Sequence, residues 1–487
     1  MIRRILISLA LFSCFAALWI FFNWPALHTE WWAMDDYVSF NQIASQHVTN
    51  VFRTLLRGGR PFATLIWILK KVIWMVMQSS EGANIAMRLF QGGTHIIIAT
   101  IIGVTLARST GHRLAFWTAL PFLLWPFGGE ATYWLSAAPY PVASLLSLIG
   151  VLLCLQPKAT LLRHSFGVGL IICSVLTNQS ATLLGLVVFC ILLTRSIGGQ
   201  QWRKIPRKPL GLILLAYTVG GMVSTLCAIW GQDQRITEAH FFLLSTPWNL
   251  LLLLWRLLIT HSDLYPSWLQ FIQIAVIFLP ILMLMSHART RPCSVMRVLF
   301  LLLFLAFLPI LPNIILDLHW LPGRLLYSAP LIYTAALCLL LLSQRKPFFN
   351  PSVVTLLLVA LMMGGYYPIS RRFALDHVIN SRNDFLTIQE LDSLAMREDI
   401  SQIVVAHKAP MINPYKIRYY WFGESVTSAF ERSWSTEGLV HFYSTQLGIT
   451  NDQKANATCL SLCTIHGNSQ RHIELISSPF RFICFCP

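Results

Sequence analysis

The chain has 487 residues, of which 55% are hydrophobic and 11% are charged. Soluble globular domains carry roughly 25% charged residues, so this composition excludes a protein whose whole surface faces water. The net charge of +16 could suit a nucleic-acid partner, but most Lys and Arg residues lie in short loops between apolar runs. That distribution is typical of the cytoplasmic loops of membrane proteins, and it argues against nucleic-acid binding.

The first apolar run follows Arg3 and Arg4 and extends over residues 5–24. It resembles a signal peptide, but it is long, and no small-x-small cleavage site follows it. We expect it to be retained as the first membrane span, with the N-terminus in the cytoplasm.

Eleven apolar runs predict an all-α, polytopic protein of the bacterial inner membrane. The predicted spans are 5–24, 85–107, 114–128, 140–156, 166–177, 180–194, 209–230, 268–286, 298–316, 325–342 and 352–368. With the N-terminus inside, the inner loops all carry Lys or Arg, whereas the outer loops 129–139, 178–179 and 317–323 carry none. This alternation predicts the orientation, and the odd number of spans places the C-terminal region in the periplasm.

Two of the predicted spans, 166–177 and 180–194, are short for a full crossing, which takes roughly 17–25 residues. Polar residues 177–180 separate them. This pattern favours a helical hairpin that turns inside a protein cavity rather than at the lipid headgroups.

Two further apolar stretches carry internal charges: Lys70 and Lys71 lie in 62–78, and Arg256 lies in 248–261. A Lys or Arg at the centre of a spanning helix costs about 2.5–3.5 kcal/mol. We therefore expect both stretches to be amphipathic helices on the outer membrane surface, with the apolar face toward the lipid. Charges deep in the bilayer are then expected nowhere in the chain.

The composition changes after Pro368, which divides the chain into a transmembrane domain, 1–368, and a polar region, 369–487. We expect this region to form a small periplasmic α+β domain, with one β-like run at Ile400–Val405. Its cysteines are Cys459, Cys463, Cys484 and Cys486. In the periplasm they can form one or two disulfides, whereas the spacing of His466 and His472 disfavours a zinc site.

The first outer loop, within 25–84, contains the adjacent carboxylates Asp35 and Asp36. Such a pair can act as a general base or hold a divalent cation such as Mg²⁺ or Mn²⁺, and like charges this close raise one another's pKa. The alternative is a solvated pair that caps the next helix, since Asp is a good N-cap residue.

Other polar residues on the outer side are few. They are Glu130 in the second outer loop, Arg235 after the seventh span, and Asp317, His319 and Arg324 between the ninth and tenth spans. Arginines at this boundary can grip a phosphate bidentately, although a single one more often extends to lipid phosphates. Tyr140 and the nearby tryptophans suit anchors at the membrane interface, and aromatic rings beside carboxylates can also stack on a sugar.

This layout resembles the GT-C class of membrane glycosyltransferases, and within it the bacterial O-antigen glucosyltransferases that modify lipopolysaccharide. The residues that carry the resemblance are Asp35-Asp36-Tyr37, Gly59-Arg60-Pro61, Tyr140-Pro141 and Asn178-Gln179. The layout is similar over residues 1–370, and the region 369–487 resembles no family that we can name.

The resemblance implies a polyprenyl-phosphate-linked sugar as donor and a glycan or glycolipid hydroxyl as acceptor. Asp35 or Asp36 would deprotonate or orient the acceptor, and the sequence does not distinguish between them. Arg60, with Arg324 and Arg235, would bind the donor phosphate and stabilise its charge as it leaves. The substrate-binding residues would be Glu130, Tyr140, Asp317 and His319. Some members of the class use a divalent metal, although no ligand cluster in this sequence requires one.

Two other classes of protein remain open. An O-antigen polymerase or ligase is also polytopic, but it usually has a large outer loop late in the chain, whereas here the large polar region is terminal. A transporter or flippase would show repeated halves and charges deep in its spans, and the sequence indicates neither. Walker and dinucleotide-binding glycine patterns are absent from the sequence, so an ATP-driven motor is not indicated.

Overall fold

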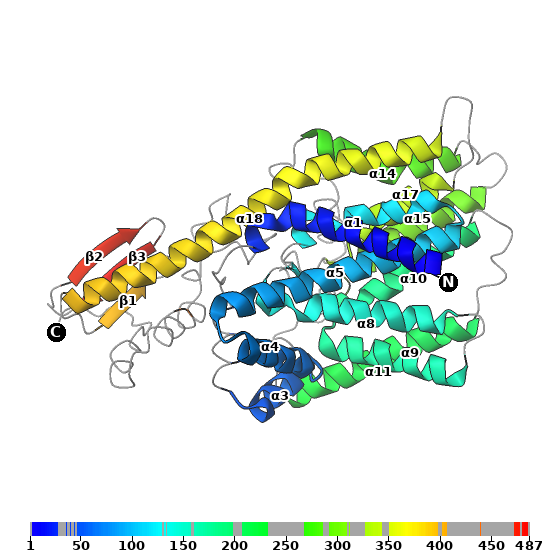
Figure 1. Ribbon diagram of the computed structural model, residues 1–487. Helices are drawn as coiled ribbons and strands as arrows, with labels where there is room; N and C mark the ends of the chain where they lie inside the picture. The colour runs from blue at the N-terminus through cyan, green and yellow to red at the C-terminus, as the bar shows by residue number, and fades with distance from the viewer. Residues whose placement is uncertain are drawn as a thin grey trace, which may run out of the picture.

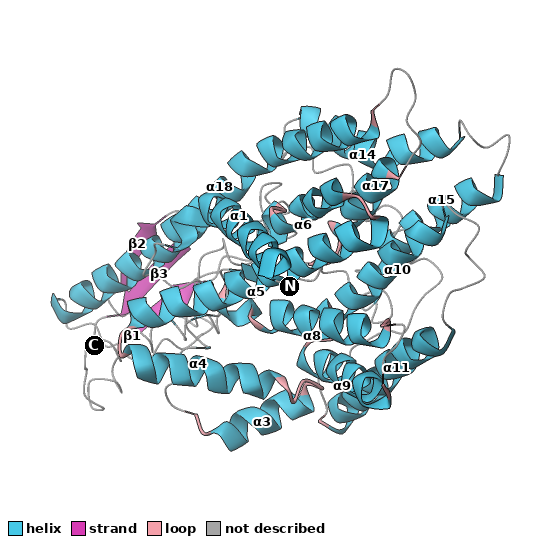
Figure 2. Ribbon diagram, turned by 45° about the vertical axis from the view of Figure 1, so that its right-hand side comes forward, coloured by secondary structure: helices cyan, strands magenta, loops and turns pink. Residues whose placement is uncertain are grey.

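The structure is a computed structural model. It describes residues 2–27, 36, 39, 43, 46–128, 131–132, 134–156, 160–197, 207–231, 267–285, 292–308, 311, 327–342, 350–397, 402–406, 439, 472–477 and 480–485. Most of these residues form a bundle of helices, and a small β-sheet lies at one end of the molecule (Figures 1 and 2).

The principal helices follow the predicted apolar runs closely. They are α1 (Ile2–Leu27), α5 (Ser80–Thr110), α8 (Pro139–Cys154), α9 (Leu161–Thr177), α10 (Leu184–Ile197), α11 (Arg207–Trp230), α14 (Ser267–Met285), α15 (Pro292–Phe307), α17 (Leu331–Leu341) and α18 (Pro351–Arg397). Within the described ranges, five helices are long and apolar enough to cross a membrane. The chain is therefore a helical membrane protein.

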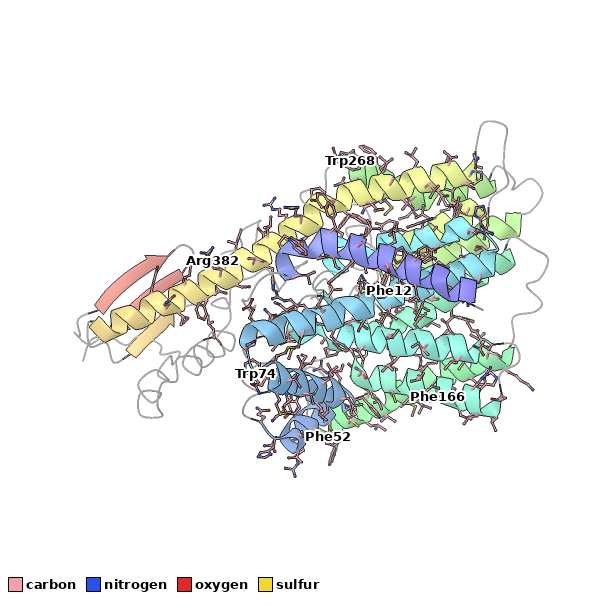
Figure 3. The ribbon with its side chains drawn as sticks, in the orientation of Figure 1. Phe12, Phe52, Trp74, Phe166, Trp268 and Arg382 are labelled. Carbon is pink, nitrogen blue, oxygen red and sulfur yellow. The ribbon has the colours of Figure 1, made fainter. Side chains whose placement is uncertain are left out.

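The outer surface of the bundle is apolar, as a protein in contact with lipid requires. Phe166 on α9 and Trp268 at the start of α14 have side chains that are 61% and 44% exposed, respectively, and both are labelled in Figure 3. On α11, Met222 and Leu226 are exposed as well. Apolar surface of this extent would be unfavourable in water and is favourable against lipid tails.

At the centre of the bundle, α17 is buried on every side. All of its residues, Leu331–Leu341, are buried, and they belong to one continuous apolar core with residues of α1, α5, α8, α10 and α14. A helix that is apolar around its whole circumference must be enclosed by other helices or by lipid. Here neighbouring helices provide much of that enclosure, including α14, α15 and α18.

The predicted third span is not one continuous helix. It consists of η1 (Arg113–Ala119), α6 (Leu120–Leu123) and η2 (Pro126–Gly128). Pro121 lies in the first turn of α6 and Pro126 begins η2, and the first turn of a helix tolerates a residue without a backbone N–H. The irregular backbone is tolerated because the protein encloses it, and Thr118 and Ala119 are completely buried.

The turn between α9 and α10 is also enclosed by protein. The side chain of Asn178 accepts hydrogen bonds from the backbone N–H groups of Ser180 and Ala181, both at 3.1 Å. Asn178 is buried, and Gln179 donates to the carbonyl oxygen of Gly59 at 3.2 Å. The polar residues that interrupt the apolar run are therefore satisfied by the protein itself.

Helix α18 continues through Pro368 and reaches Arg397, so the composition change after residue 368 does not mark a break in the backbone. Beyond the bundle the helix approaches a sheet of β1 (Gln402–Ala406), β2 (His472–Ser477) and β3 (Phe480–Phe485), as Figure 1 shows. The strand order is β1-β3-β2, with antiparallel pairing throughout. Strand β1 overlaps the predicted β-like run. Cys484 lies on β3, while Cys459, Cys463 and Cys486 lie outside the described residues.

The packing of α1 against α5 generates a prediction at two adjacent glycines. A Cβ atom at Gly92 would collide with the buried indole ring of Trp19, whereas a Cβ atom at Gly93 would meet nothing within 4 Å. We expect Gly92→Ala to lower the thermal unfolding temperature in detergent, because the Trp19 ring must shift and α1 with it. Gly93→Ala is the matched control and should leave that temperature unchanged or slightly higher. Equal effects of the two substitutions would contradict the described contact of α1 with α5.

Candidate functional site

Asp36 is the best-defined member of the predicted acidic pair. Its side chain is completely buried. One carboxylate oxygen accepts hydrogen bonds from the backbone N–H of Ser136 at 2.8 Å and from its hydroxyl at 3.1 Å. The other accepts from the backbone N–H of Leu135 at 3.3 Å. Asp36 thereby joins the segment after α1 to residues 134–136, which we call the Trp134–Ser136 turn.

The helix that carries the two lysines is α4 (Ala63–Met77), and it is preceded by α3 (Val48–Arg57). In Figures 1 and 2, α4 runs alongside the N-terminal part of α5. Lys70 is only 9% exposed, and its ammonium group donates to the carbonyl oxygen of Leu135 at 2.8 Å. The neighbouring Lys71 is half-buried and donates to the carbonyl oxygen of Gln46 at 3.1 Å.

We expected this helix to lie on the membrane surface with its apolar face toward the lipid, and the structure adds that its Lys70 side chain is buried in the protein. Burial of an ammonium group is unfavourable unless hydrogen bonds and an opposite charge compensate it. The Leu135 carbonyl and the negative charge of Asp36 supply both, and they come from segments distant in the sequence.

A stripe of polar residues on α5 completes the surroundings of the turn. Asn84, Arg88, Gln91 and His95 are spaced so that they lie on one face of the helix, and each is at most 1% exposed. The amide of Gln91 donates to the carbonyl oxygen of Trp134 at 2.8 Å. The stripe faces the protein interior rather than lipid, as polar groups in a membrane helix should.

Arg88 connects three helices at this end of the bundle. Its guanidinium donates to the carbonyl oxygen of Ala26 near the end of α1. It also donates to the ring of His377 on α18 at 3.0 Å. Arg88 is the fourth residue of the predicted span 85–107, so its charge lies near the end of that span rather than deep within it.

Further along the stripe, His95 binds residues from two other segments. Its ring hydrogen bonds to the Leu123 carbonyl oxygen at 3.0 Å and to the Tyr327 hydroxyl. Because a carbonyl oxygen only accepts, Nε2 carries a proton and donates it to Leu123. The two hydrogen bonds of the ring hold these segments together.

The pKa values of Asp36 and Lys70 are shifted because both groups are removed from water. Burial raises the pKa of Asp36 from 3.8 to about 6, although hydrogen bonds from the turn and the charges of Arg88 and Lys70 act in the opposite direction. Burial also lowers the pKa of Lys70 from 10.5 to about 8, against the attraction of Asp36. Desolvation is the larger effect at both groups, so each shift favours the neutral form.

The Gly59-Arg60-Pro61 turn binds a different part of the bundle. The carbonyl oxygen of Gly59 accepts from Gln179 at 3.2 Å and from the hydroxyl of Ser224 on α11 at 2.8 Å. The backbone N–H of Phe62 donates to Leu176 at the end of α9. Gly59 has φ +70°, and a Cβ atom there would lie 2.5 Å from the Ser224 carbonyl oxygen, so this position requires glycine. The half-buried Arg60 is thus positioned by contacts with α9 and α11.

Tyr140 lies close to the Asp36 contact. It stands at the start of α8 and packs against Trp134 and Ala137. The other predicted site residues, Asp35, Glu130, Arg235, Asp317, His319 and Arg324, lie outside the described residues. Across the described ranges, no group of three or more His, Cys, Asp or Glu side chains could hold a metal ion.

Sequence reasoning missed Lys70, Arg88, Gln91 and His377 as members of this cluster. For the α5 stripe a signal was present, because polar residues at 84, 88, 91 and 95 follow the helical period in an otherwise apolar segment. For Lys70 and His377 the partners lie 65 and 289 residues away, and no local pattern marks them.

The raised pKa of Asp36 predicts a dependence of stability on pH. Its pKa is higher in the folded state than in the unfolded chain, so its contribution to stability is full below about pH 4. That contribution is lost as the pH rises through about 6. We expect the unfolding free energy of the wild type, relative to Asp36→Asn, to fall by up to about 3 kcal/mol between pH 4 and pH 7.

The measurement is thermal unfolding of both proteins in detergent across this range. Asp376→Asn is the control, because Asp376 is 26% exposed and lies 3.8 Å from Arg372 in an ion pair on the same helix. We expect little pH-dependent difference there. A wild type that gains stability relative to Asp36→Asn as the pH rises would contradict the dominance of desolvation.

No protein-family model, curated protein or solved structure matches this chain.

Proposed function

We propose that this protein is a glycosyltransferase of the bacterial inner membrane. It moves a sugar from a polyprenyl-phosphate donor to a hydroxyl of lipopolysaccharide, O-antigen or another envelope glycan on the periplasmic side. The observation that carries the proposal is the buried polar cluster of Asp36, Lys70, Arg88 and Gln91 around the Trp134–Ser136 turn.

This cluster supports an enzyme because burial of its charged groups costs free energy, and because these groups are gathered at one place in the bundle. Buried charges contribute little net stability, and shifted pKa values gather at sites that perform chemistry. The cluster forms where the first outer loop meets α4, the start of α5 and the segment before α8. A lipid-linked donor would approach such a site from the membrane, and its activated sugar–phosphate bond would make a nucleotide motif unnecessary.

Within the acidic pair we assign different roles to the two carboxylates. A general base must come within hydrogen-bond distance of the proton that it removes. Both oxygens of Asp36 already accept hydrogen bonds from the turn, so Asp36 is the positioning residue. Asp35 is then the candidate base toward the acceptor hydroxyl, or a ligand of a divalent cation if the reaction uses one.

The remaining roles follow the resemblance. Arg60, Arg235 and Arg324 would bind the donor phosphate and stabilise the negative charge of the leaving group. Tyr140, beside the Asp36 contact, would stack on a sugar ring, with Glu130, Asp317 and His319 as further substrate-binding residues.

The deciding experiment compares lipopolysaccharide from cells with and without the gene by mass spectrometry. We expect the gene to add a single hexose. We expect Asp35→Asn to abolish this modification at unchanged membrane abundance, whereas Asp36→Asn should reduce it by about 10- to 100-fold because the pair loses its position. Altered glycan chain length would favour a polymerase, and full activity of Asp35→Asn would remove the base from the proposal.

The proposed orientation predicts the outcome of reporter fusions. A periplasm-dependent phosphatase fused after Arg397, at the end of α18, should be active, because α18 then leads out of the cytoplasm. The same reporter fused after Lys208, at the start of α11, should be inactive, because residues 195–208 keep five basic residues ahead of the fusion, namely Arg195, Arg203, Lys204, Arg207 and Lys208. The reverse pattern would place the acidic pair in the cytoplasm and would end the proposal.

A further inference from the structure

The Trp134–Ser136 turn is held from several sides by side chains. Gln91 binds the carbonyl oxygen of Trp134, and Lys70 binds that of Leu135, both at 2.8 Å. Asp36 binds the backbone N–H groups of Leu135 and Ser136. Ser39 adds a bond of 2.9 Å between its hydroxyl and that of Ser136. Side chains from the first outer loop, α4 and α5 thus form hydrogen bonds with the backbone of these three residues.

Lys70 and Asp36 hold the same residue of the turn. The ammonium group binds the carbonyl oxygen of Leu135 while the carboxylate binds its N–H. A shift of α4 that moves Lys70 would therefore move Leu135, and Leu135 would move the carboxylate. We propose that Lys70 is a positioning residue of the transfer reaction, which holds the acidic pair in place through the Trp134–Ser136 turn. This inference rests on the proposed function.

A purely structural residue at this place would have a different chemistry. Replacement of a buried ion pair by apolar side chains of similar size is often neutral or stabilising. On α4 the other inward-facing residues, such as Ile66 and Trp67, are largely apolar. An ammonium group among them is therefore better explained by what it holds than by the stability that it adds.

The charged groups described around Lys70 come from the first outer loop, from α5 and from α4 itself. Asp36 faces it from the first outer loop, and Arg88 on α5 acts on the same carboxylate. Gln91, also on α5, is uncharged. Lys71 on α4 itself binds Gln46 and lies 5.1 Å from the centre of the Trp67 ring. Because the pKa of Lys70 is lowered to about 8 by burial, the charged form is lost as the pH rises above that value.

The test uses the full-length protein in detergent or nanodiscs. Lys70→Met removes the donor at nearly constant length, and Lys70→Arg keeps a charged donor. Lys71→Met is the matched control on the adjacent residue. We expect Lys70→Met to lower kcat about 100-fold, with KM for the lipid-linked donor changed by less than about threefold. Lys71→Met should retain the wild-type kcat, and Lys70→Arg should recover at least part of it.

The pH profile separates positioning from a merely structural role. We expect the wild-type kcat to fall above about pH 8, and Lys70→Arg to extend activity to higher pH because a guanidinium stays charged. An unchanged kcat in Lys70→Met, or an alkaline limit that is identical in Lys70→Arg, would overturn the inference. If Lys70→Met does not accumulate in the membrane, the pH profile of Lys70→Arg decides.

A second readout is independent of activity. Hydrogen exchange of the peptide that contains Leu135 and Ser136 should be at least tenfold faster in Lys70→Met than in the wild type and in Lys71→Met. Unchanged exchange would overturn the inference even if the enzyme is active. If the wild type transfers no sugar, the proposed function fails, and exchange alone decides whether Lys70 holds the turn.

Discussion

The carboxylate of Asp36 is removed from water in a protein that is otherwise unusually poor in charge, and the arrangement around it follows from that constraint. A buried carboxylate is tolerated only if donors and positive charges converge on it. Here the donors are backbone N–H groups of Leu135 and Ser136, and the positive charges are those of Lys70 and Arg88. These groups belong to segments far apart in the sequence, so the positions of α4, α5 and the start of α8 are fixed together.

The helices could be predicted because the physical constraint that makes an apolar run helical acts within the run itself. A run must be buried in lipid or protein, and its backbone must satisfy its own hydrogen bonds, which favours a helix wherever the run occurs. The third run departs from this rule because it is divided into η1, α6 and η2, and the protein interior encloses the irregular backbone. The continuation of α18 through Pro368 was not predictable from composition, which changes there although the backbone does not.

The candidate site was predicted less completely, for a physical reason. Asp36 could be singled out because a pair of carboxylates stands out in a chain with so few charges, whereas Tyr140 was singled out through the family resemblance. The role of Lys70 could not be predicted. The cost of placing its charge in an apolar helix can be read from the neighbouring sequence, but Leu135 and Asp36, which compensate that charge, lie far away in the chain. Arg88 was obscured by its position in a predicted span, where Ala26 and His377 from two other helices satisfy it.

The length of α18 has a geometric consequence for the arrangement of the molecule. A continuous helix of 47 residues measures about 70 Å, more than twice the roughly 30 Å thickness of the hydrocarbon layer. Part of this helix must therefore extend beyond the hydrocarbon layer. Its base is tied to the bundle through the contact of His377 with Arg88. The small sheet, which lies near the C-terminal end of α18 in Figure 1, is thus joined to the helical bundle by one continuous helix.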